Sequence, residues 1–403
     1  MNTANSRIRI LVPYMLAYCG GVRRLLGEGL PYLQRSKRLM IEYAELCRNK
    51  KDMNEMERAG VPVNRELGVR GSGVLSHHQG ALRTLDLLKS APRLGKLIWR
   101  MRRSVSKYDA IYVHEYREML FVYAAGMISG VRTGPTVVWH CHGLGDGAPP
   151  PFLAFLANKC FKVIAVSQDT ARRLKEIGVD SSRVRVIYNA VDPERIKAQA
   201  KQQVFPLPKK GPGHSVILLA CATIRDFKGV HIAIMALEKL PLTCHLWITG
   251  DPNDPASKHY KHELDIMIAQ KGLETRVHFI GHRRDIYYVM ACSDVVVVPS
   301  LCCEAFGLVA VEAMTLEKPV IVSNRGGLPE AVGSEENGWI FDSGDPTALA
   351  MCVRTILAEP ESATKRAANG KRRVDRLFRF ERWADDVASI LTQCIPGVSG
   401  TPI

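Results

Sequence analysis

The sequence predicts an α/β protein of two domains, each a parallel β-sheet covered by helices. Its 403 residues are about two to three times the usual size of a single domain, so two cores of ordinary size are expected. Apolar runs of about five or six residues recur, each followed by a glycine or polar turn and an amphipathic stretch, which is the pattern of βα units. Strands that are apolar on both faces favour parallel sheets buried between helices. Two Rossmann-like domains in tandem are expected to face each other across a cleft at the carboxyl ends of their strands.

The first half of the chain contains the elements of one such domain. Strands are expected at 8–13, 110–114, 136–140 and 163–166, and helices at 22–48, 82–107 and 169–176. Residues 49–80 show no clear period and are expected mostly as loop.

A second set of elements follows a segment that is rich in Pro, Gly and Lys, which predicts a linker at 198–214. Strands are expected at 216–222, 245–249, 277–280, 295–299 and 319–322, and helices at 230–240, 261–271, 285–291, 308–315 and 347–358. The domains are therefore predicted as 1–197 and 215–379. The amphipathic segment 380–394 has no sheet of its own and is expected to pack back on the first domain.

The excess positive charge lies in the first half. The net charge is +15, and residues 1–200 contain 32 Lys and Arg against 17 Asp and Glu, whereas residues 201–403 contain 23 of each. A basic half beside a neutral half indicates that one domain faces a polyanion or an anionic membrane, although a basic surface without a dedicated partner is the alternative. The basic clusters lack interleaved aromatic residues, so a nucleic-acid partner is not expected.

Two protein classes are not favoured by the composition. Every stretch of 18 residues contains a charge, so no transmembrane helix is expected. The 11 cysteines include no C-x-x-C pair and no regular spacing, which indicates neither a zinc site nor a disulfide framework. Reduced thiols in a cytoplasm are the simpler interpretation.

The most specific segment is 300–314, with the sequence SLCCEAFGLVAVEAM. It places Glu304 in the turn after a buried strand, Gly307 at the start of a helix and Glu312 further along that helix. The free backbone amides of Gly307, Leu308 and Val309 would form an anion site of the kind that helix N-termini offer to phosphates. Two carboxylates beside a phosphate are better suited to flanking hydroxyl groups. A molecule with hydroxyls on both sides of a diphosphate is a nucleotide sugar.

The chain resembles the E-x7-E retaining glycosyltransferases of the GT-B fold, in particular family 4. The anchor is the pair of glutamates in 304–312. Six further segments resemble family signatures and occur in the family's order: 19–22 (CGGV), 139–144 (WHCHGL), 163–167 (VIAVS), 186–192 (VIYNAVD), 225–229 (RDFKG) and 326–330 (GGLPE). Together they cover nearly the whole chain.

This resemblance implies a role for each candidate residue. Catalytic roles fall to His142 near the reacting carbon, to Glu304 on a hydroxyl of the donor sugar, and to Arg225 and Lys228 on the leaving diphosphate. The donor-binding residues implied are Gly20, Gly21, Arg225, Lys228, Glu304, Phe306, Gly307, Leu308, Val309 and Glu312, with Glu312 on the ribose hydroxyls. Basic side chains and amides take the place of a metal in this family, so no metal and no cofactor are expected, and the donor is expected to be a UDP- or GDP-sugar. Retention is implied to proceed on one face of the sugar, without a protein nucleophile.

The histidines of the first domain have a second interpretation. His140 and His142 alternate on one strand and share a face, but this spacing supplies no third ligand, so a metal site is not expected. His114 ends another strand and is expected to be a core or cleft-wall residue.

The expected activity is sugar transfer to a lipid-linked or cell-surface polysaccharide or lipopolysaccharide acceptor, in the cytoplasm, at the inner face of the membrane. A GT-B nucleotide-sugar epimerase and a transferase with a soluble small-molecule acceptor are the alternatives. The segment 22–48, in which basic residues alternate with leucines, is expected to be the membrane-facing helix.

Overall fold

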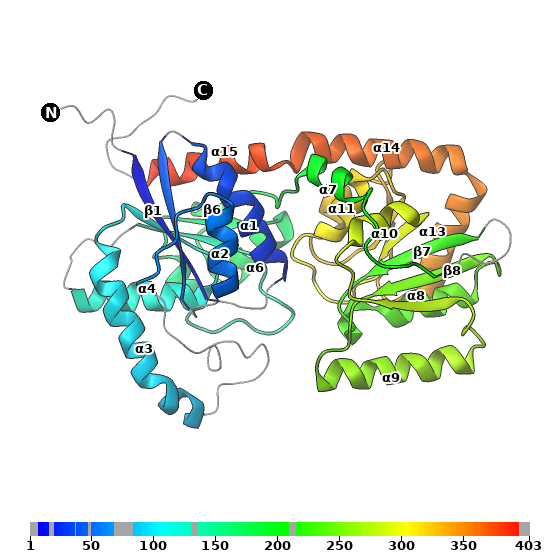
Figure 1. Cartoon of the computed structure of the whole chain (residues 1–403), viewed down its shortest axis with the longest axis horizontal. Helices are drawn as coiled ribbons and strands as arrows, with labels where there is room; N and C mark the ends of the chain where they lie inside the picture. Colours follow the sequence, from blue (N-terminus) through cyan, green and yellow to red (C-terminus); the bar gives the residue numbers. More distant parts are fainter. Residues whose placement is uncertain are drawn as a thin grey trace. The chain divides into compact units, whose positions relative to one another are not determined.

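The computed structural model describes residues 7–15, 20–36, 38–46, 50–67, 84–129, 136–208 and 215–394. The chain divides into two units, Met1–Asn189 with Phe380–Ile403 and Ala190–Arg379 (Figure 1). Each unit contains one six-stranded sheet with helices on it, and all neighbouring strands in both sheets are parallel. The predicted fold class is therefore confirmed.

The sheet of the first unit has the strand order β2-β1-β3-β4-β5-β6. Its strands are β1 (Ile8–Tyr14), β2 (Leu39–Glu45), β3 (Ala110–Val113), β4 (Thr136–Cys141), β5 (Lys162–Ala165) and β6 (Val184–Val186). Its helices are α1 (Gly20–Gln34), α2 (Lys50–Arg58), α3 (Thr84–Val105), α4 (Tyr116–Ser129), α5 (Leu153–Ala157), α6 (Gln168–Glu176) and α15 (Phe380–Gln393).

The single helix predicted over 22–48 is wrong. The structure has α1, a turn, and then the edge strand β2, which pairs with β1 along its whole length. Leu39, Ile41 and Tyr43 are buried on alternate positions, which is the period of a strand and not of a helix. The basic residues between α1 and β2 obscured this change of period.

The sheet of the second unit has the order β12-β11-β10-β7-β8-β9. Its strands are β7 (Val216–Cys221), β8 (Cys244–Thr249), β9 (Val277–Gly281), β10 (Val295–Val298), β11 (Val320–Ser323) and β12 (Trp339–Phe341). Its helices are α7 (Pro193–Gln199), the 3-10 turn η2 (Asp226–Lys228), α8 (Val230–Glu238), α9 (Pro255–Gln270), α10 (Ile286–Cys292), α11 (Leu308–Thr315), α12 (Leu328–Val332), α13 (Pro346–Ala358) and α14 (Pro360–Leu377). The strand β12 and the helices α7, α12 and α14 were not among the predicted elements.

The unit boundary lies earlier than the sequence predicts. The linker is predicted at 198–214, whereas the contacts assign the chain from Ala190 onward to the second unit. The reason is that α7 packs against α10 and α11. A proline-rich composition marks irregular backbone, but packing decides to which unit that backbone belongs.

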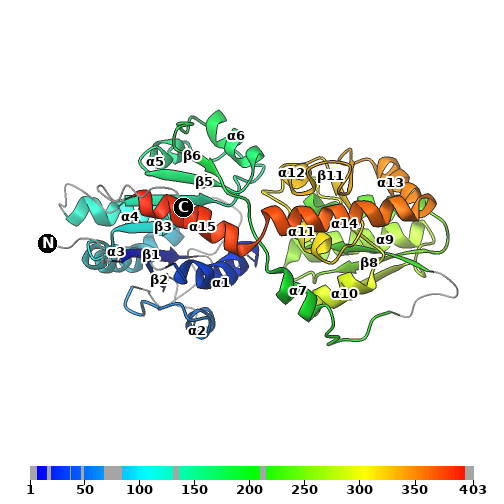
Figure 2. The same cartoon turned by 90° about the horizontal axis from the view of Figure 1, so that it is seen from above.

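The helix α15 belongs to the first unit although it ends the described chain. It packs beside α1, as both views show (Figures 1 and 2). A Cβ atom on Gly29 of α1 would lie 2.8 Å from the ring of Trp383, so the glycine permits this close approach. Tyr32 stacks on Phe380, with ring centroids 5.4 Å apart. Among the described residues, no helix has both the length and the apolar character needed to cross a membrane.

Candidate active site

Three neighbouring strands place the sequence motifs of the second unit at one edge of its sheet. In the order β11-β10-β7, the loops that leave the carboxyl ends are 324–327, 299–307 and 222–229. Because parallel strands end at the same edge, these three loops meet, and this is the edge at which open α/β sheets bind ligands.

The turn at η2 is fixed against the loop after β10. The amides of Leu301 and Cys302 both donate to the carbonyl of Phe227, at 2.8 and 3.1 Å. Gly229 has φ +67°, and a Cβ atom there would lie 2.0 Å from the carbonyl oxygen of Pro299. The contact therefore requires glycine. It brings Lys228 to the loop that carries Glu304.

Glu304 and Lys228 are in direct contact. The Lys228 ammonium donates to Oε1 of Glu304 at 2.5 Å, and the Ser300 hydroxyl donates to the same oxygen at 2.7 Å. Both ionic side chains are only about one-fifth exposed. The predicted phosphate ligand and the predicted sugar ligand thus form one charge-assisted cluster. Ser300 is an addition that sequence reasoning missed.

The loop 324–327 supports the backbone of Glu304. The amide of Gly327 donates to the Glu304 carbonyl at 2.7 Å. A Cβ atom on Gly326, which has φ +57°, would lie 2.2 Å from that carbonyl oxygen. The two glycines thus allow one backbone to lie directly against another.

The helix α11 begins at this cluster. Gly307 precedes it with φ +108°, and no side chain caps the first turn. The first amides of a helix have no partners within the helix, so the amides of Leu308 and Val309 are placed for an anion. Glu312 is 4% exposed in the next turn. Burial raises the pKa of Cys221, at the end of β7, to about 12; the hydrogen bond with Thr249 lowers this pKa, and the charge of Glu312 raises it.

Two other predicted residues have partners that the sequence did not indicate. Arg225 donates to Oδ2 of Asp254 at 2.7 Å, and Asp254 also caps α9 through a capping box with Ser257. Phe306 is 2% exposed and packs edge to face on Phe378, so its side chain belongs to the core and is not presented to a donor. Arg225 and Lys228 are therefore both paired with carboxylates.

In the first unit, Gly20 and Gly21 begin α1, after the end of β1. Cys19, which precedes them in the predicted glycine loop, lies outside the described residues.

His142 follows β4 and has two other imidazoles as neighbours. The register pairs Val113 of β3 with Trp139 of β4, so His114 and His140, the next residues, lie beside each other. Nδ1 of His114 lies 2.9 Å from Nε2 of His142, and Nδ1 of His140 lies 2.5 Å from the Tyr112 hydroxyl. The expectation that no third imidazole is available is therefore wrong, because the third comes from the adjacent strand. The positions of His114 and His140, each ending an expected strand, were the signal that could have revealed it.

The three imidazoles are held neutral by their surroundings. Burial lowers the pKa of His142 to about 3, and burial and the neighbouring imidazoles lower the pKa of His114 and His140 well below the usual value. The side-chain oxygens of Glu118 accept hydrogen bonds from the backbone amides of His114, at 2.7 Å, and of Met15, at 3.0 Å. These two bonds connect the ends of β3 and β1.

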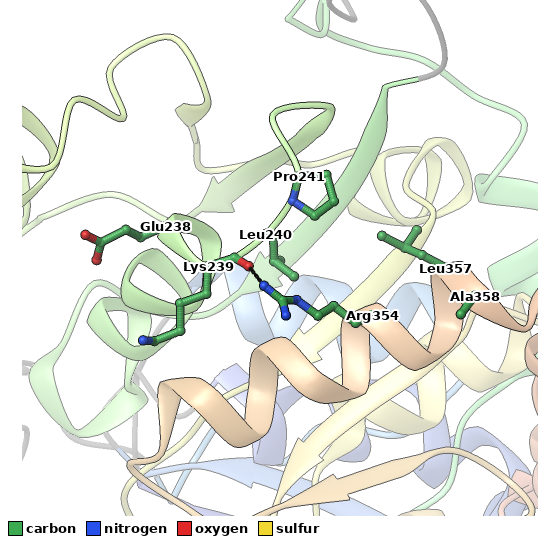
Figure 3. Close-up of a pocket in the computed structure, with 7 residues that line it drawn as sticks. All are labelled: Glu238, Lys239, Leu240, Pro241, Arg354, Leu357 and Ala358. Atoms are coloured by element: carbon green, nitrogen blue, oxygen red, sulfur yellow. Dashed lines mark hydrogen bonds between the residues drawn. The ribbon is translucent and has the colours of Figure 1, made fainter.

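A cavity of about 620 Å³ lies at the opposite edge of the second sheet (Figure 3). It is lined by Glu238, Lys239, Leu240, Pro241, Arg354, Leu357 and Ala358. Arg354 donates to the carbonyl of Lys239 across it. Because these residues end α8 and α13, ahead of β8, the cavity lies away from the carboxyl strand ends and contains none of the predicted site residues.

Two family descriptions match the chain in succession. Residues 60–195 match the family described as Glycosyltransferase Family 4, and residues 207–373 match Glycosyl transferases group 1. The chain belongs to the group 1 glycosyltransferases. The second match contains every predicted site residue of the second unit, and the first contains His142.

Similar proteins support this family membership. The chain is 29% identical over 249 residues to a glycogen synthase of Mycobacterium tuberculosis, an alignment covering 59% of this chain and 55% of the relative. It is 31% identical over 188 residues to the D-inositol 3-phosphate glycosyltransferase of Corynebacterium glutamicum, covering 44% and 43%. The chain thus spans about half the length of the curated relatives it matches.

The likeness to a solved structure extends over nearly the whole chain. The crystal structure of Anabaena Alr3699/HepE in complex with UDP and glucose matches with a TM-score of 0.76 and 24% identity, covering 96% of this chain and 99% of that one. This likeness shows the GT-B fold.

Proposed function

We propose that the protein is a retaining glycosyltransferase that moves a sugar from a nucleotide-sugar donor to a lipid-linked or cell-surface glycan acceptor. The observation that carries the proposal is the assembly of Lys228, Glu304 and the start of α11 at one sheet edge. Family membership and the UDP complexes of HepE support a nucleotide donor, with UDP ahead of GDP.

The second unit is proposed to bind the donor. The diphosphate lies at the amides of Leu308 and Val309, Glu312 accepts hydrogen bonds from the ribose hydroxyls, and Glu304 accepts one from the sugar. Without a ligand, Asp254 and Glu304 neutralise Arg225 and Lys228. The diphosphate takes over these cations on binding, so the site is preorganised for negative charge.

The proposed reaction needs little covalent chemistry from the protein. The bond between the anomeric carbon and the diphosphate oxygen breaks, and the acceptor oxygen bonds to that carbon on the same face. The acceptor proton passes to the leaving phosphate oxygen. Arg225 and Lys228 stabilise the charge that develops on the diphosphate. For His142 we propose the role that the family resemblance implies, contact with the transferred sugar.

Replacing Glu312 with alanine is expected to weaken the binding of UDP and of UDP-sugars alike, since both contain the ribose. Losing a hydrogen bond to a charged group costs about 1.5–3 kcal/mol, which is about 10- to 150-fold in the dissociation constant. Calorimetric titration measures it, and Glu274→Ala, on an exposed turn, is the control. Unchanged UDP affinity in Glu312→Ala would refute the ribose assignment.

The sequence predicts the membrane-facing helix at 22–48, but we propose α3 as the membrane-facing helix in its place. Leu25, Leu26, Leu30 and Leu33 of α1 are at most 2% exposed, so their face belongs to the core. On α3, by contrast, Trp99 is 49% exposed with the Arg103 guanidinium 4.0 Å from its ring centroid, and Arg102 is exposed. An exposed tryptophan beside arginines suits an anionic lipid surface.

The double variant Arg102→Glu/Arg103→Glu is expected to weaken sedimentation with anionic vesicles. Losing the attraction of two basic residues costs about 2 kcal/mol at low salt, or roughly 30-fold in affinity, and repulsion of the two new carboxylates adds to this loss. The matched control is Lys258→Glu/Lys261→Glu on α9, with the same change of charge in the other unit. Equal loss in both variants, or no vesicle binding by the unaltered protein, would favour a soluble acceptor.

A further inference from the structure

The three histidines of the first unit form a cluster of nitrogen donors. One ring nitrogen from each of His114, His140 and His142 lies within 4.8 Å of the others. The rings are packed together, with the centroid of His142 4.4 Å from that of His140 and 5.2 Å from that of His114. A hydrogen-bonded histidine pair contains two imidazoles, whereas the adjacent ends of β3 and β4 bring three together.

Two of the buried ring nitrogens have no hydrogen-bond partner among the described residues. These are Nε2 of His114 and Nε2 of His140, in side chains that are 1% and 0% exposed. An unsatisfied buried polar atom costs about 1–3 kcal/mol. On His140, Nδ1 is engaged by the Tyr112 hydroxyl, so donation from Nδ1–H leaves the lone pair on Nε2. Nε2 of His140 is therefore an unused acceptor in the cluster.

We propose that His114, His140 and His142 bind one divalent transition-metal ion of the zinc class. Neutral imidazoles are preferred ligands of Zn²⁺, and three of them with one open position are a known coordination. Tetrahedral bonds of about 2.0–2.1 Å place ligand nitrogens roughly 3.4 Å apart. The nitrogens of His114 and His142, now 2.9 Å apart, therefore have to separate slightly, and the third has to approach.

The surroundings resemble the outer shell of such a site. The Tyr112 hydroxyl on Nδ1 of His140 is the kind of partner that orients a metal-ligating histidine. Trp383 of α15 stacks near His140, with centroids 6.3 Å apart, and covers its ring. Cys141, between the two histidines of β4, is buried in the core cluster and is not one of the three donors.

Metal binding would act on the proposed reaction. His142 is the residue proposed to contact the transferred sugar, and coordination would occupy its ring nitrogen. The metal is therefore expected to inhibit transfer reversibly. This consequence rests on the proposed function, whereas the binding of the metal does not.

The direct test is titration of the full-length, EDTA-treated protein with Co²⁺, whose visible absorption reports tetrahedral coordination. One equivalent is expected to bind, and Zn²⁺ is expected to displace it. The band should vanish in His114→Gln and in His140→Gln, and Tyr112→Phe should weaken Co²⁺ about 10- to 100-fold. His259→Gln/His262→Gln, which removes the two histidines of α9, should bind Co²⁺ unchanged.

X-ray absorption of the zinc-loaded unaltered protein gives a readout that does not depend on how the variants fold. Three imidazole ligands are expected. Absence of a Co²⁺ band in the unaltered protein, fewer than three imidazoles on zinc, or loss of the band only in the α9 variant would overturn the proposal. Because these are spectroscopic measurements, they remain decisive if the protein proves to transfer no sugar.

Discussion

Replacing Lys228 with alanine is expected to lower kcat by about 10²- to 10³-fold and to leave the fold intact. This is the typical loss when one preorganised charge partner of a transition state is removed. The ammonium lies at the end of a turn that Gly229 holds against the loop of Glu304, so its position relative to that loop is fixed by backbone contacts. Steady-state kinetics with the productive nucleotide sugar measure the effect.

Lys261→Ala is a closely matched control for that variant. Lys261 also forms a 2.5 Å ion pair, with Asp265, and its side chain has the same 23% exposure as that of Lys228. Its alanine variant should keep full activity. A similar fall in both variants, or none in Lys228→Ala, would remove Lys228 from the reaction.

Chelators separate the proposed charge stabilisation from a metal-dependent reaction. EDTA should leave the activity of the unaltered enzyme intact, or raise it if the histidine cluster carries inhibitory metal. Activity that EDTA abolishes and a divalent ion restores would show that a metal stabilises the leaving group.

Replacing Gly326 with alanine is expected to abolish measurable UDP binding and to destabilise the second unit by about 3 kcal/mol or more. The new Cβ atom would lie 2.2 Å from the carbonyl oxygen and 2.7 Å from the amide nitrogen of Glu304. Both are backbone atoms, so a side-chain rotation cannot relieve the clash. The loop of Glu304 must shift. Because this loop leads directly into α11, the shift also displaces the amides of Leu308 and Val309 that are proposed to hold the diphosphate.

Gly272→Ala isolates the backbone part of this effect. Gly272 has φ +63°, close to the +57° of Gly326, but no described atom lies within 4 Å of a Cβ atom there. The free energy of unfolding of Gly272→Ala should fall only by the cost of a left-handed alanine, about 1–2 kcal/mol. This variant should keep full UDP affinity. Denaturant unfolding and UDP titration of both variants measure the difference. Equal behaviour of the two would show that the Glu304 loop does not depend on this contact.

The second unit was the more predictable one from the sequence. Its strands are short apolar runs bounded by turns, and the E-x7-E segment follows such a run directly, so β10, the loop of Glu304 and α11 could be placed in order. In the first unit the hydrophobic periodicity is interrupted at 34–39, where basic residues continue from α1 into β2. For this reason one long helix was predicted in place of a helix and a strand. A local pattern is informative only where one face is buried and the other is not.

The sequence by itself determined the fold class, the family and the identity of the residues at the candidate site of the second unit. The tertiary structure alone decided which of them meet. It paired Lys228 with Glu304 and Arg225 with Asp254, buried Phe306, assigned α15 to the first unit and placed His114 against His142. The physical reason is that periodicity and turn chemistry act over a few residues, whereas each of these contacts joins residues at least 28 positions apart, through the parallel order of strands or the packing of helices.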